Sequence, residues 1–171
     1  MAIEGLLPFF EGLITQYGYI ALFFSSVISA STIIIPMPLY VLIFFSAGLG
    51  LDPFLVGVVS GVGSGIGEIT GYLVGLGGSR LVGQRVKHVP EQVEMFHKYF
   101  NKYGFFAILF FGVIPFPFDI IGLMAGANNF GIKKFLLASI ISKVIKTLMI
   151  SYAGYLALPY LEFYILNPLA H

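Results

Sequence analysis

The sequence contains no cysteine and few charged residues. Of its 171 residues, 10% are charged and 58% are apolar, and the mean hydropathy is +0.95. The absence of cysteine excludes disulfides, thiolate nucleophiles and cysteine-ligated metals. The scarcity of charge excludes water as the main solvent. Because one helical span needs about 20 apolar residues, the chain has room for a few crossings and no sizeable soluble domain. We therefore expect a single membrane domain, residues 1–171, of all-α polytopic architecture.

Lysine and arginine are missing from both ends of the chain. None precedes Arg80 and none follows Lys146. The N-terminal segment carries Glu4 and Glu11 and lacks the basic region of a signal peptide, so we interpret it as mature sequence. Positive charge concentrates on the cytoplasmic side of membrane proteins. The distribution therefore predicts a cytoplasmic linker over about residues 79–102, with both chain ends outside.

Proline is absent from two of the four apolar stretches. The stretches over residues 54–78 and 135–158 are long enough to cross a bilayer once as unbroken helices. The stretches over 19–50 and 104–127 are interrupted by Pro36-Met37-Pro38 and Pro115-Phe116-Pro117. Proline removes a backbone hydrogen bond and clashes with the preceding helical turn. These two stretches are therefore predicted to be broken helices.

The two broken stretches resemble each other. Tyr17-Gly18 matches Tyr103-Gly104, the Ile-Pro-x-Pro motifs match at an offset of 79 residues (115 − 36), and Ala47-Gly48 matches Ala125-Gly126. An unbroken span follows each copy, which predicts two repeats, about residues 17–78 and 103–160.

Basic residues flank the second broken stretch on both sides, with Lys133-Lys134 after it and the basic linker before it. A segment whose two ends lie on one side of the membrane has not crossed, so we expect a re-entrant hairpin. The first broken stretch, flanked by Glu11 and Asp52, is expected to enter from the opposite face. Two inverted repeats of this kind are typical of transporters.

The expected hairpin tips are the proline pairs Pro36, Pro38 and Pro115, Pro117. Each second proline suits the first position of a new helix, so a half-helix N-terminus with unbonded amides is expected inside the membrane. Such an end attracts anions. The alternative is a simple kink in each helix.

Ionisable residues occur within the predicted spans. Glu68 and Lys143 are each expected about 15 Å deep, Lys146 lies one turn beyond Lys143, and Asp119 follows the second proline break. A charge at the membrane midplane costs at least about 2.5–3.5 kcal/mol, so these residues form the candidate transport path. The alternatives are a structural ion pair between Glu68 and Lys143 and a snorkelling Lys146.

Small residues repeat along the first predicted span. The expected helix-packing motif consists of Gly61, Gly65, Gly71, Tyr72 and Gly75. Its members let helix backbones approach closely.

Enzyme signatures are lacking. The sequence shows no catalytic triad, P-loop or dinucleotide fingerprint, and His88 and His97 have no metal-ligand spacing. We expect no catalytic residue, no cofactor, no metal and no nucleic-acid partner. The basic linker is interpreted as ordinary positive-inside flanking, with a surface-bound amphipathic helix as the alternative.

The chain resembles the DedA family, also called the SNARE-associated Golgi or VTT domain family. The segment Gly65-Ile66-Gly67-Glu68-Ile69-Thr70-Gly71-Tyr72-Leu73-Val74-Gly75 is similar to the family's G-x-x-G-[DE]-x-x-G-Y-x-x-G helix. Lys102-Tyr103-Gly104 through Pro115 to Ala125-Gly126 is similar to its second hairpin. The resemblance implies two opposed re-entrant hairpins packed on spanning helices and transport of phospholipids or polyprenyl-phosphate carriers linked to protons or ions.

The chain departs from the family pattern at several positions. Leu39-Tyr40-Val41 and Ser29-Ala30-Ser31 stand where relatives often carry acidic residues, and Gly112 and Phe118 replace the arginines beside the second hairpin's proline. Among the acidic sites only Glu68 matches the family motif. These differences describe a divergent member.

Three functions are compatible with these features. The first is translocation or scrambling of phospholipid or polyprenyl-phosphate lipids in a cell membrane, by a flippase or scramblase that contacts anionic head groups. The second is export of a small cation or ion coupled to protons through Glu68 and Asp119. The third is a non-transporting assembly factor. A homo-oligomer is compatible with all three.

The charge distribution yields a topology prediction. Single cysteines introduced at residue 92 and at residue 131 should both react with a membrane-impermeant thiol reagent from the cytoplasmic side, because the positive-inside rule places both flanks there. Labelling from opposite sides would mean that the second broken stretch spans the membrane, and the hairpin interpretation would be wrong.

Overall fold

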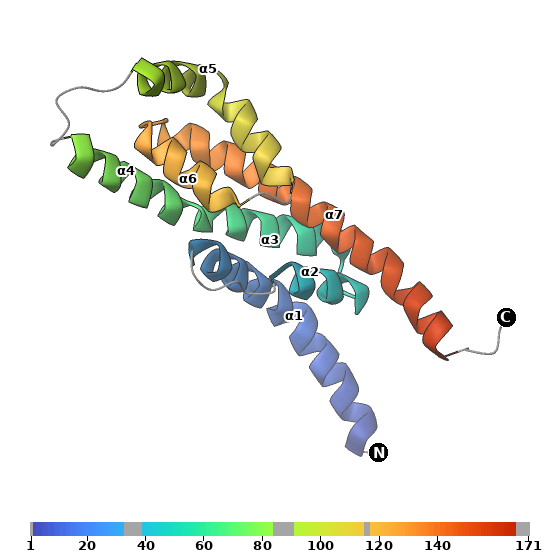
Figure 1. Ribbon diagram of the computed structural model, residues 1–171. Helices are drawn as coiled ribbons and strands as arrows, with labels where there is room; N and C mark the ends of the chain where they lie inside the picture. Colours follow the sequence, from blue (N-terminus) through green and yellow to red (C-terminus); the bar gives the residue numbers. More distant parts are fainter. Residues whose placement is uncertain (1, 33–38, 84–90, 115–116, 167–171) are drawn as a thin grey trace.

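The structure is a computed structural model that describes residues 2–32, 39–83, 91–114 and 117–166, with the side chains of residues 17–32, 39–78, 100, 102–114 and 117–158. Every regular element in these ranges is an α-helix (Figure 1). The helices are α1 (Ala2–Ser31), α2 (Leu39–Gly48), α3 (Pro53–Gly67), α4 (Ile69–Gly83), α5 (Glu91–Val113), α6 (Phe118–Ala127) and α7 (Ile132–Leu166).

Two helical segments are long and apolar enough to cross a membrane, Pro53–Gly78 and Ile132–Leu158. They match the predicted spans over 54–78 and 135–158. The first consists of α3 and α4 in line, with only Glu68 between them. It begins at Asp52, whose side chain accepts a hydrogen bond from the Leu55 amide (2.8 Å), and Pro53 occupies the first turn. Aspartate at the N-cap and proline at the helix start are the residue types that this position favours.

The two spans pack against each other in antiparallel directions. A Cβ atom on Gly65 would lie 2.6 Å from the Ile140 Cα atom, so the two backbones are in close contact there. Two hydrogen bonds continue the contact toward the start of α3, from Thr147 to the Gly57 carbonyl (2.6 Å) and from Ser151 to the Pro53 carbonyl (2.7 Å). Residue numbers that rise on α3 therefore pair with numbers that fall on α7.

The offset of 79 residues between the proline motifs also relates these contacts. Gly61 packs against Val144 and Gly65 against Ile140. Adding 79 takes Gly61 to position 140 and Gly65 to position 144. An offset of 79 residues therefore maps one of these two contacts onto the other.

The helices outside the two spans, α1, α2, α5 and α6, follow the same relation. Helix α1 packs on α3 as α5 packs on α7, while α2 packs on α7 as α6 packs on α4. The glycine contacts agree, because Gly154 abuts the Phe44 backbone and Gly75 abuts the Leu123 backbone. Position 44 plus 79 is position 123, and position 75 plus 79 is position 154. Helix α2 of the first predicted repeat therefore packs on the span of the second, and α6 of the second packs on the span of the first.

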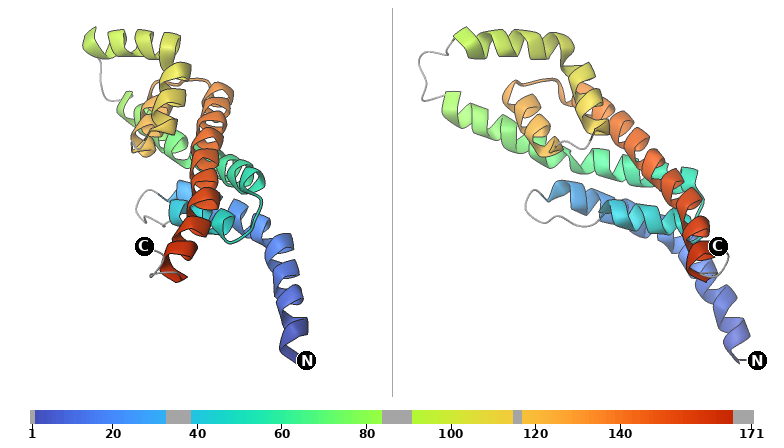
Figure 2. Two further views of the ribbon diagram at one scale, coloured as in Figure 1. Left: turned by 90° about the vertical axis from the view of Figure 1, so that its right-hand side faces the viewer. Right: turned by 45° about the vertical axis from the view of Figure 1, so that its right-hand side comes forward.

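Contacts also tie together the two flanks of each broken stretch. The Asp52 amide donates to the Tyr19 hydroxyl (3.0 Å), which joins the start of α3 to α1. The rings of Phe100 and Phe130 meet edge to face with centroids 5.6 Å apart, which joins α5 to the segment before α7. Because the spans are antiparallel, these junctions lie at opposite ends of the bundle (Figure 2).

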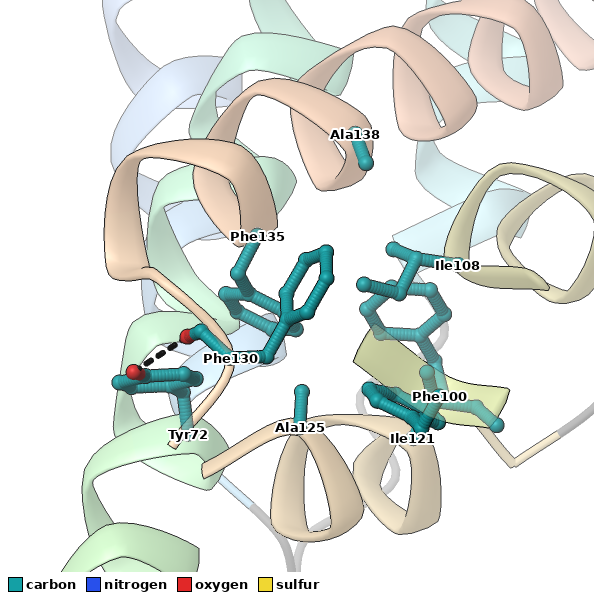
Figure 3. Packing of buried hydrophobic residues seen from close by; sticks show 9 residues of the cluster. Tyr72, Phe100, Ile108, Ile121, Ala125, Phe130, Phe135 and Ala138 are labelled. Atoms are coloured by element: carbon teal, nitrogen blue, oxygen red, sulfur yellow. Dashed lines mark hydrogen bonds between the residues drawn. The ribbon is translucent and has the colours of Figure 1, made fainter. Parts of the chain in front are cut away.

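Two apolar clusters stabilise the two halves. One contains Leu22, Leu39, Ile43, Ala47, Leu51 and Val56. The other is larger and contains Tyr72, Phe100, Ile108, Phe118, Ile121, Ala125, Phe130, Phe135 and Ala138 (Figure 3). Within it, the Tyr72 hydroxyl donates to the Phe130 carbonyl (2.6 Å), so the one polar atom of the ring is satisfied.

Outward-facing side chains are strongly apolar. Phe106 is 69% exposed, and Phe110 and Met149 are each 63% exposed. Apolar surface of this extent suits contact with lipid rather than water. The N-terminal part of α1 extends away from the bundle, and α5 changes direction, its first part lying across one end of the bundle (Figures 1 and 2).

The close contact of the spans predicts how glycine substitutions behave. Gly65→Ala should lower the melting temperature in detergent, because overpacking costs about 1–3 kcal/mol. Gly77→Ala, in the same span with nothing within 4 Å of the added atom, should leave it unchanged or raise it. Equal melting temperatures for both variants and the parent would contradict the observed packing.

Candidate functional site

A cavity of about 500 Å³ lies where the middle of both spans meets the end of α1 and the starts of α2 and α6. All four ionisable residues of the predicted transport path line it: Glu68, Asp119, Lys143 and Lys146. The rest of its lining consists of Ser29, Ala30, Thr32, Leu39, Tyr40, Ser64, Phe118 and Ile150. The cavity, called the chamber below, therefore brings four ionisable side chains together with apolar ones in an otherwise apolar helical body.

Glu68 and Lys143 form a buried ion pair. The Lys143 Nζ atom lies 2.5 Å from Glu68 Oε1, and the side chains are 7% and 4% exposed, respectively. Removing both charges from water is costly, and each offsets the other's penalty only at such close range. The second carboxylate oxygen, Oε2, is buried and has no hydrogen-bond partner among the described residues. It remains available to a ligand.

The helix is irregular at Glu68. The sequence predicts one unbroken helix here, and the continuous span Pro53–Gly78 confirms it, but Glu68, with a ψ of −12°, departs from regular helix and separates α3 from α4. The Gly67 carbonyl accepts hydrogen bonds from the Thr70 hydroxyl (3.0 Å) and from the Ser31 hydroxyl (3.4 Å). Two hydroxyls, one of them from the end of α1, therefore surround the irregularity. Irregular turns within helices often occur at functional sites.

An aromatic ring lies beside each lysine of the cavity. Lys143 Nζ is 4.4 Å from the centroid of the Phe118 ring, and Lys146 Nζ is 4.9 Å from that of Tyr40. Lys146 also donates to the Ile114 carbonyl at 3.2 Å. Ring faces and carbonyl oxygens stabilise an ammonium group without cancelling its charge. Lys146 therefore brings to the cavity an ammonium group that contacts a carbonyl and a ring.

Residues beside both proline motifs border this cavity. Thr32 and Leu39, on either side of the first proline motif, line it, and so does Phe118 after the second motif. Pro36, Pro38 and Pro115 lie outside the described residues. Pro117 is the N-cap of α6, with φ −61°, rather than the first helical residue that the sequence predicts. The fixed φ of proline fits either position, and the helix begins one residue later.

The predicted packing glycines of the first span contact two helices, α7 and α6. Gly61 and Gly65 contact α7, and Gly75 contacts the backbone of α6 at Leu123. Gly71 is less tightly packed, with its nearest neighbours, Asp119 and Gly122 of α6, at 3.8 and 3.9 Å from an added Cβ atom. These contacts bring the start of α6, and with it Asp119, to the side of Glu68.

A polar stripe leads from the cavity along α3. Ser60, Ser64 and Glu68 follow one another at four-residue spacing, so they share one helix face. The hydroxyls of Ser60 and Ser64 are buried without a hydrogen-bond partner among the described residues. Ser64 lines the cavity. The stripe continues the polar character of the chamber toward the Asp52 end of the span.

Two site residues escaped the sequence analysis. Tyr40 and Phe118 were noted only as departures from the family pattern, yet their rings contact the two lysines. The one feature of the sequence that points to these two residues is their position, one or two residues after a proline motif. Lysines on a distant helix and aromatic residues at a helix start are not linked by any local spacing.

Comparisons with known proteins now identify the family. The model of the VTT domain matches residues 35–156, most of the chain. The chain belongs to the VTT domain family. VTT domain proteins, the DedA or SNARE-associated family, are membrane proteins that have been proposed as transporters and are regarded as non-enzymatic. This VTT domain protein is therefore a membrane protein of transporter-like type.

One relative of this VTT domain protein is an uncharacterised protein of Methanocaldococcus jannaschii. It is 27% identical over 145 residues, which cover 84% of this chain and 88% of that protein. No solved structure matches the chain.

The ion pair predicts non-additive stability effects. Lys143→Met and Glu68→Gln should each destabilise the protein, Lys143→Met by about 3–5 kcal/mol, because a buried charge loses its partner. The double variant should lose clearly less than the sum of the two, which thermal unfolding of all four proteins in detergent can measure. Strictly additive losses would show that the two side chains do not interact.

Proposed function

We propose that this VTT domain protein translocates or scrambles lipids whose head groups contain phosphate. The observation that carries this proposal is the charged cavity in the middle of the spans. Glu68 is ten residues from the Gly78 end of its span (78 − 68), about 15 Å along the helix. Charged groups at that depth are costly in a membrane and mark a path for a polar solute.

Lys146 is the proposed contact for the phosphate. Its ammonium group faces the cavity, and its partners among the described residues are a carbonyl and a ring. Lys143, by contrast, is engaged by Glu68 at 2.5 Å. A lipid phosphate would replace neutral partners at Lys146 with a charge-assisted hydrogen bond, which is the stronger kind.

The size of the cavity suits a head group rather than a whole lipid. Its volume of about 500 Å³ lies within the range of about 300–1,000 Å³ for small-molecule sites. Acyl or prenyl chains would remain in the bilayer, against apolar surface such as Val41 and Phe45 of α2, which are 53% and 48% exposed. A polar path bordered by apolar surface lets the head group cross while the tails stay in the hydrocarbon core of the bilayer.

The proposed topology is an inverted repeat of two re-entrant hairpins. The antiparallel packing of the repeat-related spans supports it, because equivalent spans of inverted repeats run in opposite directions. The hydrogen bond between Asp52 and Tyr19 and the ring contact between Phe100 and Phe130 also support it, since each holds both flanks of one broken stretch together. Irregular backbone is tolerated in a membrane where it borders a cavity.

A second candidate is the proton-coupled export of a small cation. The unpartnered Oε2 atom of Glu68 favours it, because a buried carboxylate oxygen can take a proton or bind a cation. Lipid movement and proton flux measured in the same proteoliposomes separate the two candidates.

Glu68→Gln tests the proposed path. The variant keeps the size of the side chain and removes its charge. It should be less stable than the parent, because Lys143 loses its partner, but it should remain folded in detergent. It should slow lipid movement at least about tenfold, equivalent to about 1.4 kcal/mol in the barrier. The measurement is the movement of fluorescent phospholipids between leaflets of proteoliposomes over a series of pH values.

Asp52→Asn is the matched control. It makes the same chemical change at the exposed N-cap of α3, where asparagine also caps well, so lipid movement should match the parent. A stable Glu68→Gln protein that moves lipid at the parent rate throughout the pH series would show that the carboxylate has only a structural role.

A further inference from the structure

We propose that the cavity selects zwitterionic phospholipid head groups, binding the phosphate at Lys146 and the ammonium group at Asp119. This inference rests on the proposed function and narrows its substrate class. It disfavours lipids that carry a phosphate alone, including polyprenyl phosphates, and phospholipids with a net negative charge.

The four charges of the cavity divide into one pair and two single groups. Glu68 and Lys143 neutralise each other at 2.5 Å, and both are almost fully buried. Asp119 and Lys146 line the same cavity, and neither forms an ion pair with a described residue. Outside the ion pair, a ligand therefore meets one carboxylate and one ammonium group, while Glu68 presents its Oε2 atom from within the pair.

The single groups have different surroundings. Lys146 is fixed by the Ile114 carbonyl and the Tyr40 ring. Asp119 lies in the first turn of α6, where the helix dipole stabilises a negative charge. Both groups thus face the chamber without a countercharge from any residue that the structure describes, which leaves each of them available to a ligand of opposite sign.

Charge matching decides which head group fits. The formal charges of Glu68, Asp119, Lys143 and Lys146 cancel, so the chamber is neutral overall. A head group with a phosphate and an ammonium group pairs every charge in the chamber. A head group with a phosphate and no cation leaves Asp119 unpaired beside a second anion, and an unpaired charge away from water is costly. Discrimination of this kind is what electrostatic complementarity provides.

The test compares two labelled lipids with identical acyl chains in the same proteoliposomes. One carries phosphoethanolamine and the other carries phosphoglycerol. The parent should move the phosphoethanolamine lipid faster by about tenfold, which corresponds to about 1.4 kcal/mol. Asp119→Asn gives the chamber a net positive charge, so it should move the ratio of the two rates toward the phosphoglycerol lipid by about the same factor.

Three further variants make the result specific. Asp119→Glu keeps the charge and should keep the parent ratio, Lys146→Gln should slow both lipids because both carry phosphate, and Asp52→Asn should change neither rate. Each variant is checked for a single monodisperse species in detergent before the assay.

Two outcomes would overturn the inference while leaving the proposed function intact: equal or faster movement of the phosphoglycerol lipid by the parent, or an Asp119→Asn protein with the parent ratio. Failure of the parent to move either lipid would instead contradict the proposed function itself, and the head-group inference would fall with it.

Discussion

Close packing between the two spanning helices determines where the charged residues inside the spans can lie. Glycine at positions 61 and 65 lets the backbone of α3 touch that of α7. A charged residue in the middle of a span is costly, and its penalty is reduced only by a partner within a few ångströms. The glycine contact brings Lys143 within 2.5 Å of Glu68, so helix packing and charge pairing are one constraint. The cavity forms beside that pair because α2 and α6 begin there.

In the proposed repeat, the backbone contacts are symmetric, and residue differences at a few matched positions make the site asymmetric. Contacts between backbones obey the offset of 79 residues, as Gly75 and Gly154 show. The charged residues of the cavity do not follow this offset. The counterpart of Glu68 is Thr147, the counterpart of Lys143 is Ser64, and the counterpart of Asp119 is Tyr40. Thr147 uses its hydroxyl to hold α7 against α3. One repeat relation thus maintains the helix contacts, while divergence at matched positions creates a single chamber with a defined set of charges.

Periodic and compositional features were predictable from the sequence, and cross-helix contacts were only partly so. Both spans follow from the length of uninterrupted apolar sequence, and the grouping of Glu68 with Lys143 follows from equal depth in two helices. The irregular turn at Glu68 has no local signal, because glycine, isoleucine and threonine beside it are compatible with a regular helix. The rings of Tyr40 and Phe118 over the lysines depend on how α2 and α6 pack on the other repeat, which no local pattern encodes.

The central claim is that a lipid head group passes through the cavity beside Glu68, and a reversible block of that cavity tests it most directly. Ser64 lines the cavity, has a small side chain, and lies in a chain without cysteine, so Ser64→Cys provides a single thiol at the proposed path. Modification with a methanethiosulfonate reagent should stop lipid movement in proteoliposomes, and reduction of the mixed disulfide should restore it. Gly77→Cys, on the exposed face of the same span, should be insensitive. Undiminished lipid movement by fully modified Ser64→Cys protein would contradict the account.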